Sequence, residues 1–197
     1  MQNNNAPVIS NPVMLDRVIA EIQNGLVAGL PWLDVAFGRA QRITRMLEGK
    51  KIITPNVYCG GWANHGENDY IEVSPDSNIG NFSFFDINDP HEISAGPWAQ
   101  DIKTPFGLVI WFDLRRVYGT YDNRNTEQLK AAVLRILSGR TGFALSDGKI
   151  IVNQIYERAE NIYRGYTLSE IDNQYLMHPY GGFRFEGILE YQEPCIG

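Results

Sequence analysis

Carboxylate, amide and imidazole side chains gather in one short stretch of the sequence, Asp86-Ile-Asn-Asp-Pro-His-Glu92. Oxygen and imidazole donors of this kind are the usual ligands of divalent metals, so the stretch is a candidate metal site. It lacks the spacing of a calcium loop, and His65 and His178 stand in other contexts without an HxH or HExxH spacing. We therefore expect no metal and no other cofactor, and interpret the stretch as a turn built from Asx side chains.

Paired carboxylates are the other residues whose spacing could support chemistry. Glu157 with Glu160, and Glu186 with Glu190, could act as an acid and a base on a substrate. Spacing alone does not show that either pair flanks a substrate, and solvated helix or strand faces have the same pattern. The sequence also contains no GxSxG elbow, no CxxC pair and no complete P-loop. An enzyme is therefore the function class that the residues favour least.

Composition predicts a globular protein with a sizeable core. The chain has 197 residues, of which 44% are hydrophobic and 20% charged, and its formal net charge is -6. The acidic balance argues against a dedicated DNA-binding protein. No run approaches the roughly 18 apolar residues of a membrane helix, and the Asn-rich start lacks the apolar core of a signal peptide, so we expect a soluble protein made in the cytoplasm. Cys59 and Cys195 are expected to be unpaired thiols.

The first quarter of the chain predicts an arm, a helix and one ambiguous segment. Residues 1–10 form a polar, flexible N-terminal arm, and residues 11–197 form a single domain. A helix begins at Asn11-Pro12, with Asn11 as its cap, and ends at Gly29. Residues 31–48 have apolar positions that favour a helix, while Gly38 and the Glu48-Gly49 turn also permit a hairpin. We predict a helix there, with the hairpin as the alternative.

The rest of the chain predicts a sheet with helices laid mainly on one face. Short or alternating apolar runs predict strands over 52–58, 70–73, 82–87, 106–114, 150–156 and 180–191. Helices are expected from Asn125, with Gly139 as the stop, and over 167–174, opened by Thr167 or Ser169. Residues 60–69 and 88–104 are expected to be long irregular loops. The fold class is α+β, with a single mixed or antiparallel sheet.

Aromatic side chains are frequent in the expected loops. They include Trp62, Trp98, Tyr118, Tyr121, Tyr163, Tyr166 and Tyr175. Individually such residues anchor loops, and together they favour a protein interface, where Trp, Tyr and Arg are enriched. A carbohydrate-stacking surface that uses Trp62 and Trp98 is the alternative. The candidate interface residues are Trp62, His65, His91, Trp98, Tyr118 and Tyr121. We expect contacts to concentrate in the two loops and the N-terminal arm, because Trp62 and Trp98 have no evident core partner.

The sequence also resembles tailed-phage neck and tail-completion proteins, of the tail-terminator or head–tail connector type, from phages of Bacteroidetes-like hosts. The residues that carry the resemblance are Pro55-Asn-Val-Tyr-Cys-Gly60, Gly80-Asn-Phe-Ser-Phe-Phe-Asp86, Ile110-Trp-Phe-Asp-Leu114, Ile155-Tyr-Glu157 and Leu176-Met-His-Pro-Tyr-Gly-Gly-Phe-Arg-Phe-Glu-Gly187. They are patterns of sheet and loop residues, and they span most of the chain.

The resemblance implies a virion structural protein. Proteins of this kind assemble from identical subunits into a ring, usually sixfold or twelvefold, at the junction of capsid and tail. The ring caps the tail tube and docks it to the head–tail connector, while genome DNA passes through the lumen without specific binding. The family has no enzymatic residues to carry over, and no membrane partner. The expected location is the neck or tail of the virion, after synthesis in the host cytoplasm.

Overall fold

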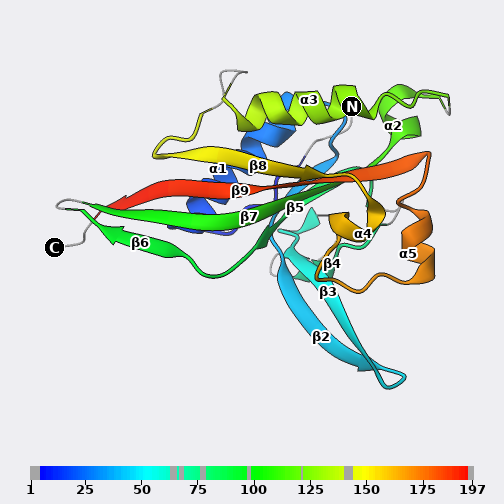
Figure 1. Cartoon of the computed structure of the whole chain (residues 1–197), viewed down its shortest axis with the longest axis horizontal. Helices are drawn as coiled ribbons and strands as arrows, with labels where there is room; N and C mark the ends of the chain where they lie inside the picture. The colour runs from blue at the N-terminus through cyan, green and yellow to red at the C-terminus, as the bar shows by residue number, and fades with distance from the viewer. Residues whose placement is uncertain are drawn as a thin grey trace.

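The computed structural model describes residues 5–62, 66, 69–75, 79–96, 99–120, 122–139 and 144–194. Its elements in chain order are α1 (Leu15–Gly29), β1 (Val35–Arg39), β2 (Gln41–Leu47), β3 (Lys50–Tyr58), β4 (Tyr70–Glu72), β5 (Phe82–Ile87), β6 (Glu92–Ala95), β7 (Ala99–Asp113), α2 (Leu114–Tyr118), α3 (Thr126–Leu137), β8 (Gly148–Tyr156), α4 (Ala159–Ile162), α5 (Glu170–Gln174) and β9 (Tyr180–Pro194). Figure 1 shows their arrangement. The α+β class expected from the sequence is confirmed.

The strands form two sheets where the sequence predicted one. The large sheet has the order β1-β5-β7-β9-β8, and β6 pairs with β7 beside it. Only β1 and β5 pair in parallel; the other described pairs in this sheet are antiparallel. β7 and β9 are its longest pair, matched from Ala99 opposite Pro194 to Asp113 opposite Tyr180. The small sheet, β2-β3-β4, consists of one long hairpin and a short third strand.

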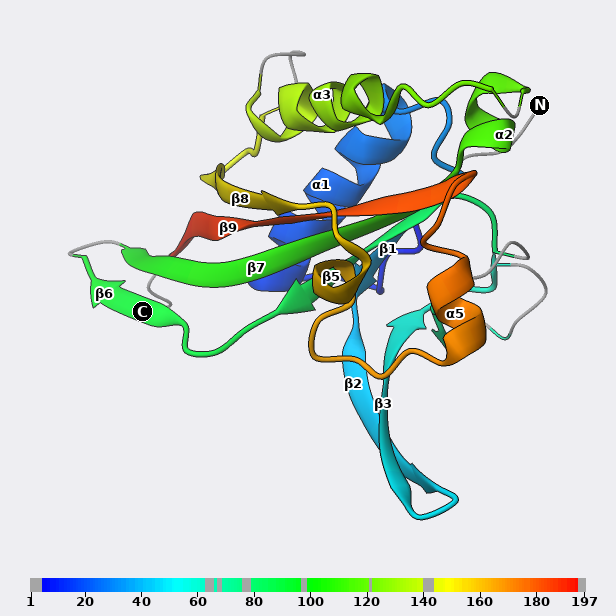
Figure 2. The same ribbon diagram turned by 45° about the vertical axis from the view of Figure 1, so that its right-hand side comes forward.

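The two longest helices cover one face of the large sheet. The apolar stripe of α1 is buried as its helical spacing predicts, and α3 adds a second stripe beside it (Figure 2). Facing them, Phe183, Phe185, Leu189 and Tyr191 of β9 lie on one side of the strand, as alternation requires. Asn125 caps α3 by accepting a hydrogen bond from the backbone N–H of Gln128, so the predicted start of this helix is confirmed.

The opposite face of the sheet carries an aromatic core under the short helices. Phe82 stacks on Phe84 and on Trp111, and Tyr163, directly after α4, packs against Phe84. Both faces of the central strand β7 are therefore covered over residues 106–114, as predicted. The two longest helices, α1 and α3, lie on one face of the large sheet, as predicted. The short helix α4 packs on the other face.

One predicted helix boundary and one predicted element type are wrong. The first helix begins at Leu15 and not at Asn11, because Asn11 and Met14 have φ angles of 51° and 50°, which are not helical. Residues 31–48 contain β1 and β2 in place of a helix. The turn after β2 places Glu48 and Gly49 at φ angles of 49° and 77°, the geometry of a two-residue hairpin turn. The hairpin alternative is correct for the Glu48-Gly49 turn, across which β2 pairs with β3, whereas β1 pairs with β5 in the other sheet.

The segment 88–104 is also more regular than predicted. β6 pairs with the first part of β7, from Glu92 opposite Lys103 to Ala95 opposite Gln100, so the expected long loop is largely a hairpin. At the other end of the chain, Asn5 of the expected N-terminal arm (residues 1–10) lies along β1. The N–H of Asn5 donates to the carbonyl of Asp34 at 3.1 Å, and the N–H of Ala36 donates to that of Asn5 at 2.9 Å. The described part of this N-terminal segment is thus held on its own domain.

Candidate interaction surface

The candidate metal stretch does not assemble a metal site. No group of three His, Cys, Asp or Glu side chains could hold a metal ion within the described part of the chain. Asp86 is buried and accepts hydrogen bonds from Arg184 at 2.6 Å and from Tyr166 at 2.8 Å. Nδ1 of His91 lies 2.8 Å from the Thr104 hydroxyl oxygen, and its Nε2 lies 3.6 Å from Asp89. The Asp86 carboxylate is therefore committed to side chains of its own protein.

Asp86 belongs to a buried network of charges that fills a gap in the sheet. Glu186, Gly107 and Asp86 lie opposite one another on β9, β7 and β5, in one row. Because Gly107 has no side chain, the guanidinium of Arg184 lies over it and joins the two carboxylates, with Nε 2.6 Å from Glu186. Arg184 and Asp86 are each 1% exposed. A substrate has no access to these groups, so the network is structural.

The carboxylate pairs considered for catalysis are also largely occupied by cations. Glu157 pairs with Lys130, and Glu186 pairs with both Arg184 and Arg164. Glu190 pairs with two lysines. These three carboxylates therefore serve as acceptors in ion pairs within the protein.

The network is connected to the base of the β2–β3 hairpin, which we call the arm (residues 41–58). Arg42 of β2 lies 3.0 Å from Asp86, and its guanidinium lies over the ring of Tyr166 at 5.5 Å. Burial and the adjacent Asp86 raise the pKa of Tyr166 far above its usual value, so its hydroxyl remains a donor. Two hydrogen bonds between Thr167 and the backbone of Ile53 add a second attachment. The base of the arm is therefore fixed to the body.

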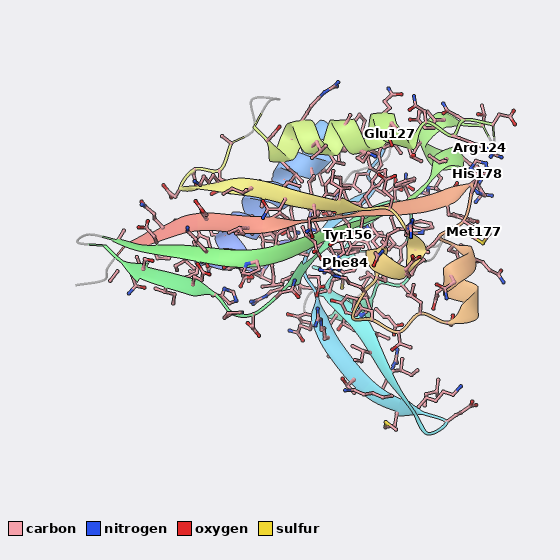
Figure 3. All side chains as sticks on the ribbon, in the orientation of Figure 1. Phe84, Arg124, Glu127, Tyr156, Met177 and His178 are labelled. Carbon is pink, nitrogen blue, oxygen red and sulfur yellow. The ribbon has the colours of Figure 1, made fainter. Side chains whose placement is uncertain are left out.

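Beyond its base, the arm stands clear of the body. Every residue of β2 is exposed, and the exposed fractions reach 41% for Ile43, 67% for Met46 and 62% for Leu47. Figure 3 labels Phe84 near the centre of the molecule and shows the side chains of the arm pointing outward, with no other described segment around its tip. An isolated two-stranded hairpin is marginally stable in water. The arm presents an apolar surface that no other described segment covers.

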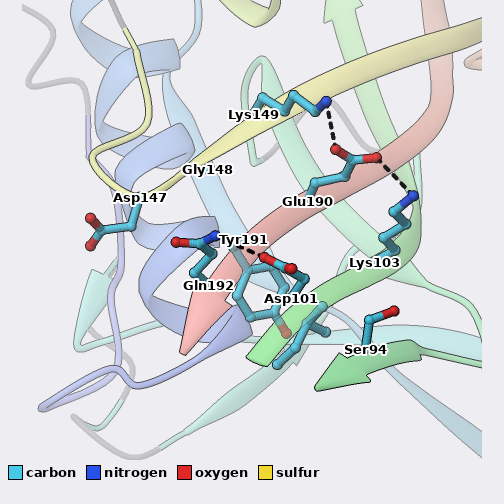
Figure 4. Close-up of a pocket in the computed structure, with 10 residues that line it drawn as sticks. Ser94, Asp101, Lys103, Asp147, Gly148, Lys149, Glu190, Tyr191 and Gln192 are labelled. Atoms are coloured by element: carbon cyan, nitrogen blue, oxygen red, sulfur yellow. Dashed lines mark hydrogen bonds and ion pairs between the residues drawn. The ribbon is translucent and has the colours of Figure 1, made fainter. Parts of the chain in front are cut away.

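A second exposed surface lies on the large sheet, where β6, β7, β8 and β9 extend past the short helices. We call it the open sheet face; it forms a cavity of about 560 Å³. Lys149, Glu190 and Lys103 lie in one row across three strands, with Glu190 between the lysines at 2.7 Å and 3.4 Å (Figure 4). In the next row, the Gln192 side chain donates to Asp101 at 2.8 Å. The result is a polar surface with regularly spaced charges.

The row of Lys149, Glu190 and Lys103 affects the pKa of Glu190. The hydrogen bond from Lys149, together with the charges of Lys149 and Lys103, holds the pKa of Glu190 below its ordinary value of 4.5, against a smaller effect of burial. A carboxylate with a depressed pKa in the folded state contributes stability above its ordinary pKa and loses it as the pH falls through the folded value. We expect Lys149→Met to raise the Glu190 pKa towards 4.5, measured by carboxyl NMR titration. Lys51→Met, outside the row, is the control, and an equal shift in both variants would contradict the assignment.

The sequence-predicted interface residues do not form one cluster in the described structure. Trp62 packs edge-on against buried Phe37, with ring centroids 5.6 Å apart, so the expectation that it lacks a core partner is wrong. Tyr118 lines a groove of about 390 Å³ beside α1 and α3, and donates its hydroxyl to the carbonyl of Asn125 at 2.9 Å. Burial raises its pKa. His91 contacts Thr104, as described above. The remaining three candidates, His65, Trp98 and Tyr121, lie outside the described residues.

Sequence reasoning kept the hairpin only as an alternative and did not consider the arm as a candidate contact surface. The available signal was the Glu48-Gly49 turn between two runs that mix Ile, Thr, Arg and Lys, a composition of exposed strands. The free thiol expected at Cys59 is confirmed, and this cysteine is buried; Cys195 lies outside the described residues.

Comparison of the chain with models of known protein families and with characterised proteins finds no match. Among the helices that the structure describes, none combines the length and the apolar character needed to cross a membrane.

Proposed function

We propose that the protein is a structural subunit of a phage neck or tail, which forms a ring as a tail terminator or head–tail connector. The observation that carries the proposal is the arm: a hairpin fixed at its base and exposed in Met46 and Leu47 along its free part. An exposed apolar surface of this kind supports contact with another molecule. Head-to-tail contact between identical subunits closes into a ring when the rotation permits.

The sequence resemblance supports a position of the ring at the junction of capsid and tail. Its subunits contact one another, the tail tube protein below and the connector above, in the virion. The net charge of -6 supports a lumen through which DNA slides, since a dense basic lining would bind phosphates. The carbohydrate-binding alternative loses support, because Trp62, one of its two stacking residues, packs on Phe37.

Exchange of an apolar arm residue tests the proposal. We expect Met46→Asp to leave the monomer folded, because Met46 is 67% exposed, and to weaken self-association about 30-fold, since loss of an interface anchor costs about 2 kcal/mol. Sedimentation over a concentration series would measure association, and complementation of a deletion phage would measure incorporation into virions.

Met177→Asp is the matched control, because Met177 is also 67% exposed but lies outside the arm. It should leave association unchanged. Wild-type protein that stays monomeric at every concentration, and is missing from the neck and tail of purified particles, would refute the proposed function.

A further inference from the structure

We infer that, in the ring, the arm of one subunit docks on the open sheet face of the next copy; this inference rests on the proposed function. It begins from the distribution of charge along the chain. Residues 41–51 contain Arg42, Arg45, Lys50 and Lys51 against Glu48, a net charge of +3. Because the whole chain carries -6, the remainder carries -9. A basic arm on an acidic body attracts the body of another copy.

The open sheet face has an acidic excess. Asp101, Asp147 and Glu190 line it together with Lys103 and Lys149, and at its edge Arg17 of α1 bridges Asp147 and Glu193. Both lysines are directed at Glu190, and Asp101 contacts the amide of Gln192 (Figure 4). Exposed Glu92 on β6 extends the charged row, opposite Lys103. Glu92 and Asp101 are therefore placed to meet Lys50 and Lys51 of the arm, whose two arginines pair with Asp86 and Glu72 of their own chain.

An apolar row lies directly beside the charged row. Ile151, Ile188 and Pro105 are paired across β8, β9 and β7, on the same side of the sheet as Lys149, Glu190 and Lys103. All three are only partly buried, and none packs against either core cluster. A surface with an apolar row beside a charged row suits an arm whose exposed residues include both apolar and basic side chains.

The position of the two surfaces excludes contact within one molecule. The arm leaves the body beside β4 and α5. The open sheet face lies at the other end of the large sheet, where β7 begins and β9 ends (Figures 1 and 2). Two different surfaces that meet between copies make a head-to-tail contact, which is the type that generates rings. The site is thus complete only when a second copy supplies the arm.

Mixed disulfide formation tests the docking site directly. The full-length chain carries Cys195→Ser in all samples, and buried Cys59 is retained. One protein has Met46→Cys on the arm; a second has Ser94→Cys on the open sheet face. After mixing under mild oxidation, we expect a disulfide-linked heterodimer at about tenfold higher yield than when the arm protein is mixed with Met177→Cys. Ile188→Cys in the apolar row provides a second position if Ser94→Cys folds poorly.

A charge exchange gives an independent readout. Lys50→Glu with Lys51→Glu on the arm should weaken association about tenfold, and Glu92→Lys with Asp101→Lys on the partner should restore it. Self-association without the arm-to-face disulfide and without rescue would overturn the docking site and leave the ring proposal standing. A disulfide from the Met46→Cys arm to the tail tube protein in virions, in place of a second copy, would likewise overturn it. No association at all would refute both.

Discussion

Replacing Arg184 with Met is expected to lower the free energy of unfolding by about 3–5 kcal/mol, the usual cost of leaving one partner of a buried ion pair without the other. Asp86 would keep Arg42 and Tyr166 but lose the guanidinium at 2.6 Å, and it is only 1% exposed. Glu186 would lose its buried contact at the same time. Urea denaturation, monitored by tryptophan fluorescence, measures the change.

Arg45→Met is the control for Arg184→Met. Arg45 also pairs with a carboxylate, that of Glu72, but its side chain is 56% exposed. Exposed pairs contribute about 0–1 kcal/mol, because water screens them and side-chain entropy opposes them. Similar losses in the two variants would mean that burial of the Arg184 network contributes nothing special to stability.

Replacing Gly187 with Ala is expected to lower the free energy of unfolding by about 3 kcal/mol and to loosen β8 from the sheet. A Cβ at this position would lie 1.8 Å from the carbonyl oxygen of Ile151 on β8. Because this atom belongs to the backbone, no rotamer change relieves the clash, and the strands must separate. The register between β8 and β9 already shifts next to this point, between Val152 and Gln154.

Gly38→Ala is the matched control, since Gly38 also lies in a strand. The nearest atom to its added Cβ is the Gln23 side-chain oxygen, at 3.4 Å, which a small movement accommodates. We expect a change within about 1 kcal/mol, because Ala also reduces the entropy of the unfolded chain. Hydrogen exchange should show faster exchange of β8 amides only in Gly187→Ala; unchanged exchange there would contradict the steric argument.

Local patterns predicted the elements that local physics determines. The stripes of α1 and α3, the Asn125 cap and the alternation of β9 all depend on residues close in sequence, and the structure confirms them. The segment 31–48 was wrong because its apolar residues fit a helical period by coincidence, while β1 gains its partner β5 from far along the chain. Pairing at that distance leaves no local signature.

The burial of Arg184 shows why the charged network could not be predicted. On β9, Arg184 alternates with phenylalanines as a solvent-exposed residue would. Its burial depends on Asp86, 98 residues away, and on Gly107, which leaves room for the guanidinium. The open sheet face escaped prediction for the same reason, since its rows join residues from four strands.

The place of β9 in the sheet has a consequence for synthesis. β9 is the last of these strands to leave the ribosome, yet it lies between β7 and β8, and β8 pairs with no other described strand. Until residues 180–194 are made, β8 has no place in the sheet and one edge of β7 stays open. Ile188, Glu190 and Gln192, at the middle of the open sheet face, arrive with the same strand. In the docking that we propose, an unfinished chain would have an arm but no complete sheet face to receive the arm of another copy, so only molecules that include β9 would make both contacts.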